Sequence, residues 1–177
     1  IRLSVDAGNP VTYASVRNVP RGHWDRVWAN IVGLREHGYA GTLGVGFVVT
    51  PDNYAGIENC GVLAKMSGAS YLRAGAVFSA DGTAFYGDLI HEIAHEVARA
   101  KAALDDESFE VVDLFGRRIG DLEEGRPEDP ECGYQYLTMY IGGDLNVYRC
   151  CNTAYTRAGA VGSLKEQRLR DAVLAYE

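Results

Sequence analysis

The residues with the most direct chemical potential are two histidines and a glutamate in the sequence His91-Glu92-Ile93-Ala94-His95. This HExxH pattern places two imidazoles one helical turn apart, with a glutamate that could act as general base on a zinc-bound water. Taken alone, it predicts a zinc peptidase. A catalytic zinc needs a third protein ligand, and a downstream glutamate could supply it: Glu107, Glu110, Glu123, Glu124 or Glu128.

The helical wheel of this segment argues against a metal site. The helix expected over Leu89 to Leu104 has an apolar stripe that would pack on a sheet, and His91 and His95 fall nearly opposite that stripe. We therefore expect both histidines to face solvent. The residues of the stripe are Leu89, Ile90, Ile93, Val97, Ala100 and Leu104.

The second candidate for metal chemistry is a set of cysteines in the last third of the chain. Cys132 lies 18 positions before Cys150, which is followed directly by Cys151, and the turn Gly142-Gly143-Asp144 lies between them. A hairpin at this turn would bring Cys132 and Cys150 together, as thiolate ligation of iron or zinc requires. Buried thiols that pack a small core are the alternative, and the spacing does not separate the two. Cys60 is predicted to be a packed thiol.

These candidates lie on a chain in which expected strands and helices alternate up to residue 115. Alternating or continuous apolar runs predict strands, and apolar residues that recur every three or four positions predict helices. The run from Leu43 to Val49 predicts a strand that is buried on both faces. The other predicted strands are Arg2–Asp6, Tyr71–Phe78 and Phe109–Phe115, and the predicted helices are His23–His37 with a Gly38 cap, Asn53–Ser67 and Leu89–Leu104. This alternation is typical of an α/β fold with parallel strands and right-handed crossovers.

Past residue 116 the composition shifts to charged residues and proline, and the alternation ends. We expect a second, smaller module there. It contains a β-hairpin formed by Tyr134–Tyr140 and Asn146–Arg149, followed by a helix within Leu164–Leu174. The predicted domains are residues 1–116 and 117–177.

The composition limits the classes of partner. Seventeen Lys and Arg against 24 Asp and Glu leave a net charge of -7, so we expect no nucleic-acid partner. The longest apolar run is far shorter than the ~20 residues that cross a bilayer, and no export signal opens the chain, so we expect no membrane partner. Four cysteines, two of them adjacent, suit a reducing compartment and predict a cytoplasmic protein.

The run from Tyr140 to Leu164 matches much of a known pattern, a D-G-x-V-Y-x-C turn followed by G-x-I/V-G-x-L/I. The matching residues are Asp144, Val147, Tyr148, Cys150, Val161, Gly162 and Leu164. Leu145 stands where the pattern normally has glycine. On these residues the segment resembles the auxiliary-cluster region of radical S-adenosylmethionine (radical SAM) enzymes, of the SPASM or twitch type.

The first half of the chain is similar to the same family. Ser4-Val5-Asp6-Ala7-Gly8, with Tyr13 and Val16-Arg17 after it, resembles the fourth barrel strand and the helix that follows. Phe47 to Tyr54 resembles the fifth strand and its exit, and Gly68 to Arg73 resembles the sixth. The order and spacing of these segments extend the resemblance over nearly the whole chain.

The resemblance implies a portion of a partial (β/α)6 TIM-type barrel, followed by a small twitch-like or SPASM-like module. Such a barrel holds S-adenosylmethionine on a 4Fe-4S cluster, and reductive cleavage of the cofactor yields a 5′-deoxyadenosyl radical that takes a hydrogen atom from the substrate. By the same resemblance, Ser4 would contact the ribose of S-adenosylmethionine and Arg17 its carboxylate, with help from Asp6. Val49 and Leu72 would flank the adenine.

In the second module the resemblance makes Cys132 and Cys150 the ligands of an auxiliary cluster, with Cys151 as a substitute. Arg73, which would point into the barrel, becomes a candidate for contact with substrate or cofactor, or for a salt bridge to a neighbour. The family also implies an electron donor such as flavodoxin or ferredoxin. Peptide, sugar and nucleoside substrates all stay open.

The family's signature loop, C-x-x-x-C-x-x-C, does not occur in this sequence. We therefore expect a middle segment of a longer enzyme, without radical chemistry of its own. Two other classes stay open: a zinc hydrolase built on HExxH, and a binding domain that has the fold without the chemistry.

Overall fold

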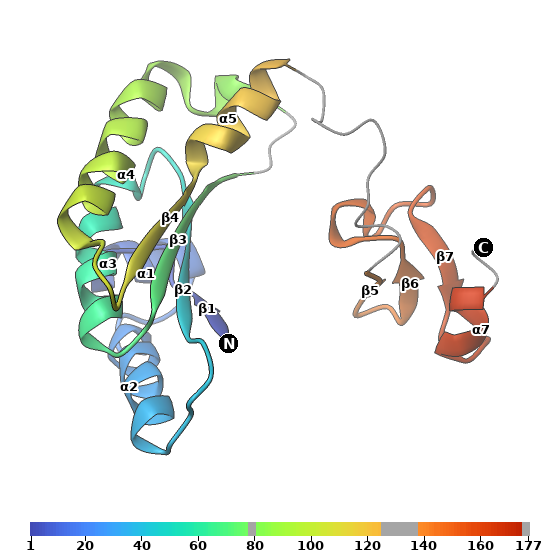
Figure 1. The fold of residues 1–177 in the computed structure, drawn as a ribbon. Coiled ribbons are helices and arrows are strands. Elements are labelled where there is room, and N and C mark those ends of the chain that lie inside the picture. Colours follow the sequence, from blue (N-terminus) through green and yellow to red (C-terminus); the bar gives the residue numbers. More distant parts are fainter. Residues whose placement is uncertain (78–80, 125–137, 175–177) are drawn as a thin grey trace. The chain divides into compact units, whose positions relative to one another are not determined.

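The structure is a computed structural model that describes residues 1–77, 81–124 and 138–174 (Figure 1). The chain divides into two compact units, Ile1–Pro127 and Glu128–Glu177. The division lies beyond the boundary predicted at residue 116, because the chain continues as a helix, α5 (Phe115–Glu124), that belongs to the first unit.

The first unit is an α/β structure built on a four-stranded parallel sheet. Its strands are β1 (Arg2–Ser4), β2 (Gly44–Val49), β3 (Tyr71–Ala76) and β4 (Glu110–Leu114). Their order in the sheet is β1-β2-β3-β4, so each strand pairs with the next one along the chain. The predicted α/β class with parallel strands is confirmed.

Three helices follow the predicted ones closely: α2 (His23–Glu36), α3 (Ile57–Met66) and α4 (Ile90–Leu104). Gly38 ends α2 in the left-handed conformation, with φ +81, as its predicted capping role requires. The periodicity did not predict α1 (Pro10–Arg17), because this helix buries no residue and so has no apolar stripe. Its signal was local: the Asn9 side chain caps it by accepting hydrogen bonds from the Val11 and Thr12 amides.

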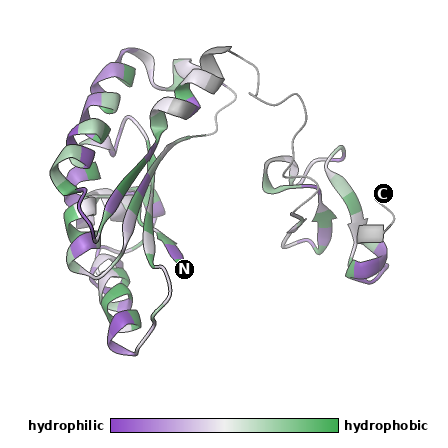
Figure 2. Ribbon diagram, in the orientation of Figure 1, coloured by the Kyte–Doolittle hydropathy of each residue, from purple (hydrophilic) through white to green (hydrophobic). Residues whose placement is uncertain are grey.

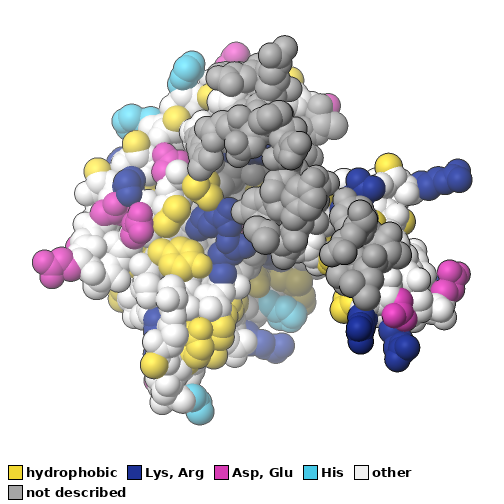
Figure 3. All heavy atoms as spheres, turned by 45° about the vertical axis from the view of Figure 1, so that its right-hand side comes forward, with side chains coloured by type: hydrophobic (Ala, Val, Ile, Leu, Met, Phe, Trp, Pro, Cys, Tyr) yellow, Lys and Arg dark blue, Asp and Glu magenta, His cyan; other side chains and the backbone are white. Residues whose placement is uncertain are grey.

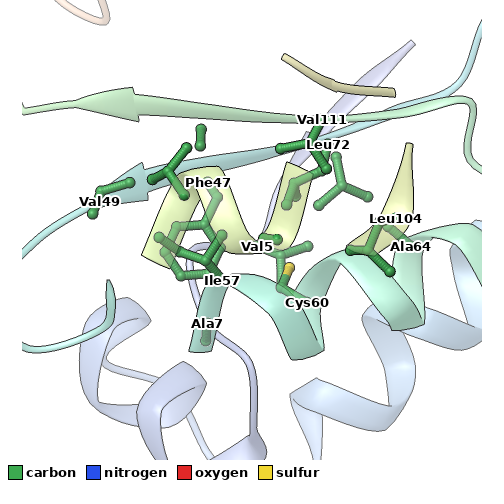
Figure 4. Packing of buried hydrophobic residues seen from close by; sticks show 14 of the residues in the cluster. Val5, Ala7, Phe47, Val49, Ile57, Cys60, Ala64, Leu72, Leu104 and Val111 are labelled. Atoms are coloured by element: carbon green, nitrogen blue, oxygen red, sulfur yellow. The ribbon is translucent and has the colours of Figure 1, made fainter. Parts of the chain in front are cut away.

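Helices α1 to α4 lie on one side of the sheet (Figure 1). A helix that packs on a sheet needs an apolar face toward the sheet and a polar face toward solvent. Figure 2 shows both hydrophobic and hydrophilic residues around α4. The core lies between this layer and the sheet, and Figure 4 shows Phe47 and Val5 of the sheet side close to Ile57 and Cys60 of α3. Cys60 is fully buried there, and burial raises the pKa of its thiol, so it is the packed thiol that the sequence predicted.

The other side of the sheet is not covered by a helix among the described residues of the first unit. We call it the open face, and it carries Arg2, Ser4, Gly46, Val48 and Arg73, which alternate along their strands with the core residues. The prediction that Leu43–Val49 is buried on both faces is therefore wrong at its end, where Val48 is 43% exposed. A continuous apolar run cannot show which face lacks a partner layer.

The second unit contains a three-stranded antiparallel sheet of order β5-β6-β7. Its elements are β5 (Tyr140–Ile141), β6 (Asn146–Tyr148), β7 (Ala160–Ser163) and α7 (Leu169–Leu174). The predicted hairpin and the predicted helix are confirmed, although residues 134–137 of the first hairpin strand lie outside the described residues. The sequence did not predict β7, because Ala160-Val161-Gly162-Ser163 lacks apolar alternation and forms a strand only by pairing with β6.

Candidate functional site

Asp6 lies at the carboxyl end of β1, the end at which parallel α/β sheets usually bind ligands. It is buried and has a positive φ of 58°. Because β1 ends at Ser4, no backbone carbonyl of that strand meets the Val48 amide, and Asp6 Oδ1 accepts its hydrogen bond at 2.7 Å. The other carboxylate oxygen forms an ion pair with the Arg17 guanidinium. Two of the predicted cofactor-binding residues are thus in direct contact.

Burial raises the pKa of the Asp6 carboxyl above its usual value. The hydrogen bond from the Val48 amide and the positive charge of Arg17 act in the opposite direction, but they offset the desolvation only in part. Asp6 therefore combines a buried charge with a backbone conformation that favours glycine or asparagine. Buried charges and strained backbone conformations cost free energy, and both concentrate at functional sites. The end of β1 is therefore the strongest candidate site in the first unit.

Asn53 holds the end of β2 against the end of β1. Its Nδ2 donates to the Asp6 carbonyl at 3.0 Å and to the Val48 carbonyl at 2.9 Å, and its Oδ1 accepts from the Thr50 amide at 2.7 Å. The side chain is buried and its described hydrogen bonds all go to backbone groups. The sequence does not mark this residue as functional, because an asparagine two positions after a proline resembles an ordinary turn residue.

Tyr86 is a second positioning residue that no sequence pattern indicates. Its hydroxyl accepts a hydrogen bond from the Val77 amide at 2.6 Å and donates one to the Val49 carbonyl at 3.0 Å. It thereby joins the carboxyl ends of β2 and β3. Burial raises the pKa of this hydroxyl, so the proton that Val49 accepts is retained at physiological pH.

We predict that Tyr86→Phe lowers the free energy of unfolding by about 2 kcal/mol, because the Val77 amide and the Val49 carbonyl lose their buried partner. Chemical denaturation measures this change. Tyr54→Phe is the matched control, since Tyr54 loses only a hydrogen bond to the exposed Glu92 and should change stability by less than about 0.5 kcal/mol. Equal losses in the two variants would contradict the role of Tyr86.

The other predicted cofactor-binding residues separate into two groups. Ser4 is exposed on the open face, beside Gly46 in the register, and Arg73 follows on the next strand. The side chains of Val49 and Leu72 are fully buried in the core on the opposite side of the sheet. A ligand on the open face can therefore meet these two positions only through their backbone or their neighbours.

The histidines of the HExxH motif lie on the outer surface of α4, as the helical wheel predicts. His91 and His95 are exposed, whereas Ile93 and Val97 of the stripe are fully buried. Glu92 Oε1 accepts a hydrogen bond from the Tyr54 hydroxyl at 2.8 Å. Within the described ranges, no three or more His, Cys, Asp and Glu side chains come together in a group that could hold a metal ion.

The candidate cluster ligands of the second unit follow β6. Cys150 is half-buried, with Sγ 3.6 Å from Thr153 Oγ1, and Cys151 is exposed at the start of a short 3-10 turn (Cys151–Thr153). Both cysteines lie in the loop between Arg149 and Gly159. A hydrogen bond of 3.0 Å from the Arg149 amide to the Gly159 carbonyl closes this loop. Cys132 lies outside the described residues.

The hairpin turn before these cysteines is held by Asp144. Its Oδ2 accepts hydrogen bonds from Tyr148 Oη at 2.6 Å and from Asn146 Nδ2 at 2.7 Å, which lowers the pKa of its carboxyl and raises the pKa of the Tyr148 hydroxyl. Leu145, the next residue, has a φ of +65°. A left-handed conformation explains why glycine would suit this position better than Leu145.

We predict that Leu145→Gly stabilises the hairpin by about 1 kcal/mol, because glycine relieves the strain and the exposed leucine packs against little. The β6 amides should then exchange with solvent about fivefold more slowly. Ile141→Gly is the control, since Ile141 is equally exposed (45% against 47%) but has no positive φ, and it should accelerate exchange. Faster exchange in Leu145→Gly would contradict the claim that the positive φ strains Leu145.

No helix in the described part of the chain has both the length and the apolar character needed to cross a membrane. Comparison of the chain with protein-family models gives no match, and neither does comparison with curated protein sequences. The assignment of a function therefore depends on the residues and geometry described above.

Proposed function

We propose that this chain forms part of a radical SAM enzyme, with strands β1 to β4 as a portion of its (β/α)6 barrel. The observation that carries the proposal is the strand order β1-β2-β3-β4 with the helices on one side. This order arises when every right-handed crossover adds the next strand on the same side of the previous one. The strands of a (β/α) barrel are added in this way. In a doubly wound sheet the order reverses and helices cover both faces.

The open face would line the interior of that barrel and bind S-adenosylmethionine. Ser4 would donate to the ribose, and Arg17 would bind the carboxylate with the part of its guanidinium that Asp6 leaves available. Asp6 thus acts as a positioning residue for Arg17. The backbone near Val49 and Leu72 would flank the adenine.

The second unit would supply ligands for an auxiliary 4Fe-4S cluster. Cys132 and Cys150 would be ligands, with Cys151 as a substitute, and a cluster of this kind takes four thiolates, so further ligands would be required. When bound, S-adenosylmethionine would supply radical chemistry: one electron from a donor such as flavodoxin or ferredoxin, passed through the enzyme's 4Fe-4S cluster, would cleave it to methionine and a 5′-deoxyadenosyl radical that takes a hydrogen atom from the substrate.

Isothermal titration calorimetry with S-adenosylmethionine tests the proposal. We expect saturable binding that weakens about fivefold in Ser4→Ala, because one hydrogen bond to the ribose is lost. Ser67→Ala, at the end of α3, is the control and should bind as the unsubstituted chain does. Absence of binding, or equal binding by both variants, would contradict the proposal. So would one bound zinc per chain that disappears in His91→Ala.

A further inference from the structure

Two arginines on the open face, one from β1 and one from β3, flank Gly46 of β2. Arg73 is the neighbour of Gly46 on β3. Arg2, on β1, extends along its strand until its side chain covers Gly46: a Cβ added at Gly46 would lie 3.6 Å from Arg2 Cδ and 3.8 Å from Nε. We call Arg2 and Arg73 the arginine pair. In Figure 3, which brings the open face toward the viewer, Lys and Arg side chains lie among hydrophobic ones on the first unit.

The arginine pair has no partner among the described residues: neither guanidinium makes a hydrogen bond or an ion pair with any of them. Arg35 and Arg17 behave differently. Arg35 donates to the carbonyls of Gly68, Tyr39 and Gly41, and Arg17 pairs with Asp6. The arginine pair therefore places two exposed guanidiniums on one face of the sheet, with no acidic partner among the described residues.

The backbone beneath the arginine pair adds little bulk to the open face, although the side chain of Arg2 lies over Gly46. Gly46 places no side chain between the two guanidiniums, and Ser4 Oγ lies 3.5 Å from the position that a Cβ at Gly46 would take. A Cβ at Gly75, farther along β3, would meet no atom within 4 Å. Among the described strand residues of this face the acidic one is Glu110, which is opposite Tyr71 in the register of β3 and β4 and forms no ion pair with any described arginine.

We propose that the arginine pair binds an oxyanion, a phosphate monoester or a carboxylate, that belongs to the enzyme's substrate. Planar guanidiniums present two parallel N–H donors to such groups. The oxyanion site stands on the geometry of the open face alone. Its assignment to the substrate rests on the proposed function, which gives Arg17 the carboxylate of the cofactor.

Equilibrium dialysis of the full chain with radiolabelled inorganic phosphate, and separately with radiolabelled succinate, at constant ionic strength, tests the site. We expect saturable binding that weakens about tenfold or more in Arg2→Gln and in Arg73→Gln, because each removes a charge-assisted bidentate contact. Arg26→Gln, an exposed arginine of α2, should bind as the unsubstituted chain does. The tighter of the two probes identifies the group as a phosphate or a carboxylate.

Three results would overturn the proposal: no saturable binding of either probe, an equal loss in Arg26→Gln, or binding that Arg73→Gln leaves unchanged. Calorimetry with S-adenosylmethionine separates the site from the proposed function. If Arg73→Gln abolishes cofactor binding, the arginine pair serves the cofactor and the substrate assignment is wrong. If phosphate binds but the unsubstituted chain takes up no S-adenosylmethionine, the oxyanion site stands and the radical SAM proposal fails.

Discussion

Gly8→Ala should lower the free energy of unfolding of the first unit by about 3 kcal/mol, because two backbone segments touch at this residue. A Cβ on Gly8 would lie 2.3 Å from the Gly56 carbonyl oxygen, and a Cβ on Gly56 would lie 2.7 Å from the Gly8 nitrogen. Asn59 Nδ2 also donates to the Gly8 carbonyl. No rotamer change can relieve such a clash, since backbone atoms stand on both sides.

Urea denaturation of Gly8→Ala and Gly33→Ala provides the comparison. Gly33 lies inside α2, and a Cβ there would meet nothing within 4 Å, so alanine should stabilise the chain by about 0.5–1 kcal/mol through its higher helix propensity. A Gly8→Ala variant as stable as the unsubstituted chain would contradict the close approach. The contact matters for function because it fixes the loop after β1, and with it Asp6, against the segment that follows β2.

Asp6→Ala should cost about 2–3 kcal/mol, whereas Asp6→Asn should cost about 1 kcal/mol. Alanine leaves the buried Val48 amide without an acceptor. It also lacks the polar side chain that lets Asp and Asn adopt a positive φ by local hydrogen bonding. Asparagine keeps an acceptor for Val48 and tolerates this conformation. Arg17 is partly exposed, so it can turn to water when the charge of Asp6 is removed.

The stability difference between the unsubstituted chain and Asp6→Asn should depend on pH. Because burial raises the pKa of Asp6 in the folded chain above its ordinary 3.8, the folded state binds more protons than the unfolded state just above that pH. Unfolding then releases protons, and the stability relative to Asp6→Asn should fall as the pH rises through this window. A relative stability that grows with pH would show that the attraction of Arg17 outweighs desolvation.

Much of the first unit could be predicted from periodicity, because its helices and strands bury regular apolar faces. Helices α2 and α4 carry continuous stripes, and β2 and β3 carry runs of apolar residues. The same argument explains the failures. Helix α1 has no fully buried residue, and β7 depends on pairing with β6, so neither leaves a periodic signal.

The candidate site was predictable only in part. The position of Asp6 after a strand indicated the carboxyl end of the sheet, but nothing local showed that Asn53 and Tyr86 would bind backbone groups more than 30 residues away. The role of Arg2 depends on tertiary pairing: the register places it beside Gly44, and its side chain extends along the sheet to Gly46, the neighbour of Arg73. Contacts of this kind follow from tertiary pairing, and no spacing in the sequence encodes them.

The most direct test of the central claim, that the open face is the ligand-binding surface, is a nitrogen-15 NMR titration of the chain with S-adenosylmethionine. The amides of Ser4, Gly46 and Val48 should shift in a saturable way, while those of His91 and His95 on α4 should not move. Shifts confined to the two histidines, or a titration in which no amide of the open face moves, would contradict it.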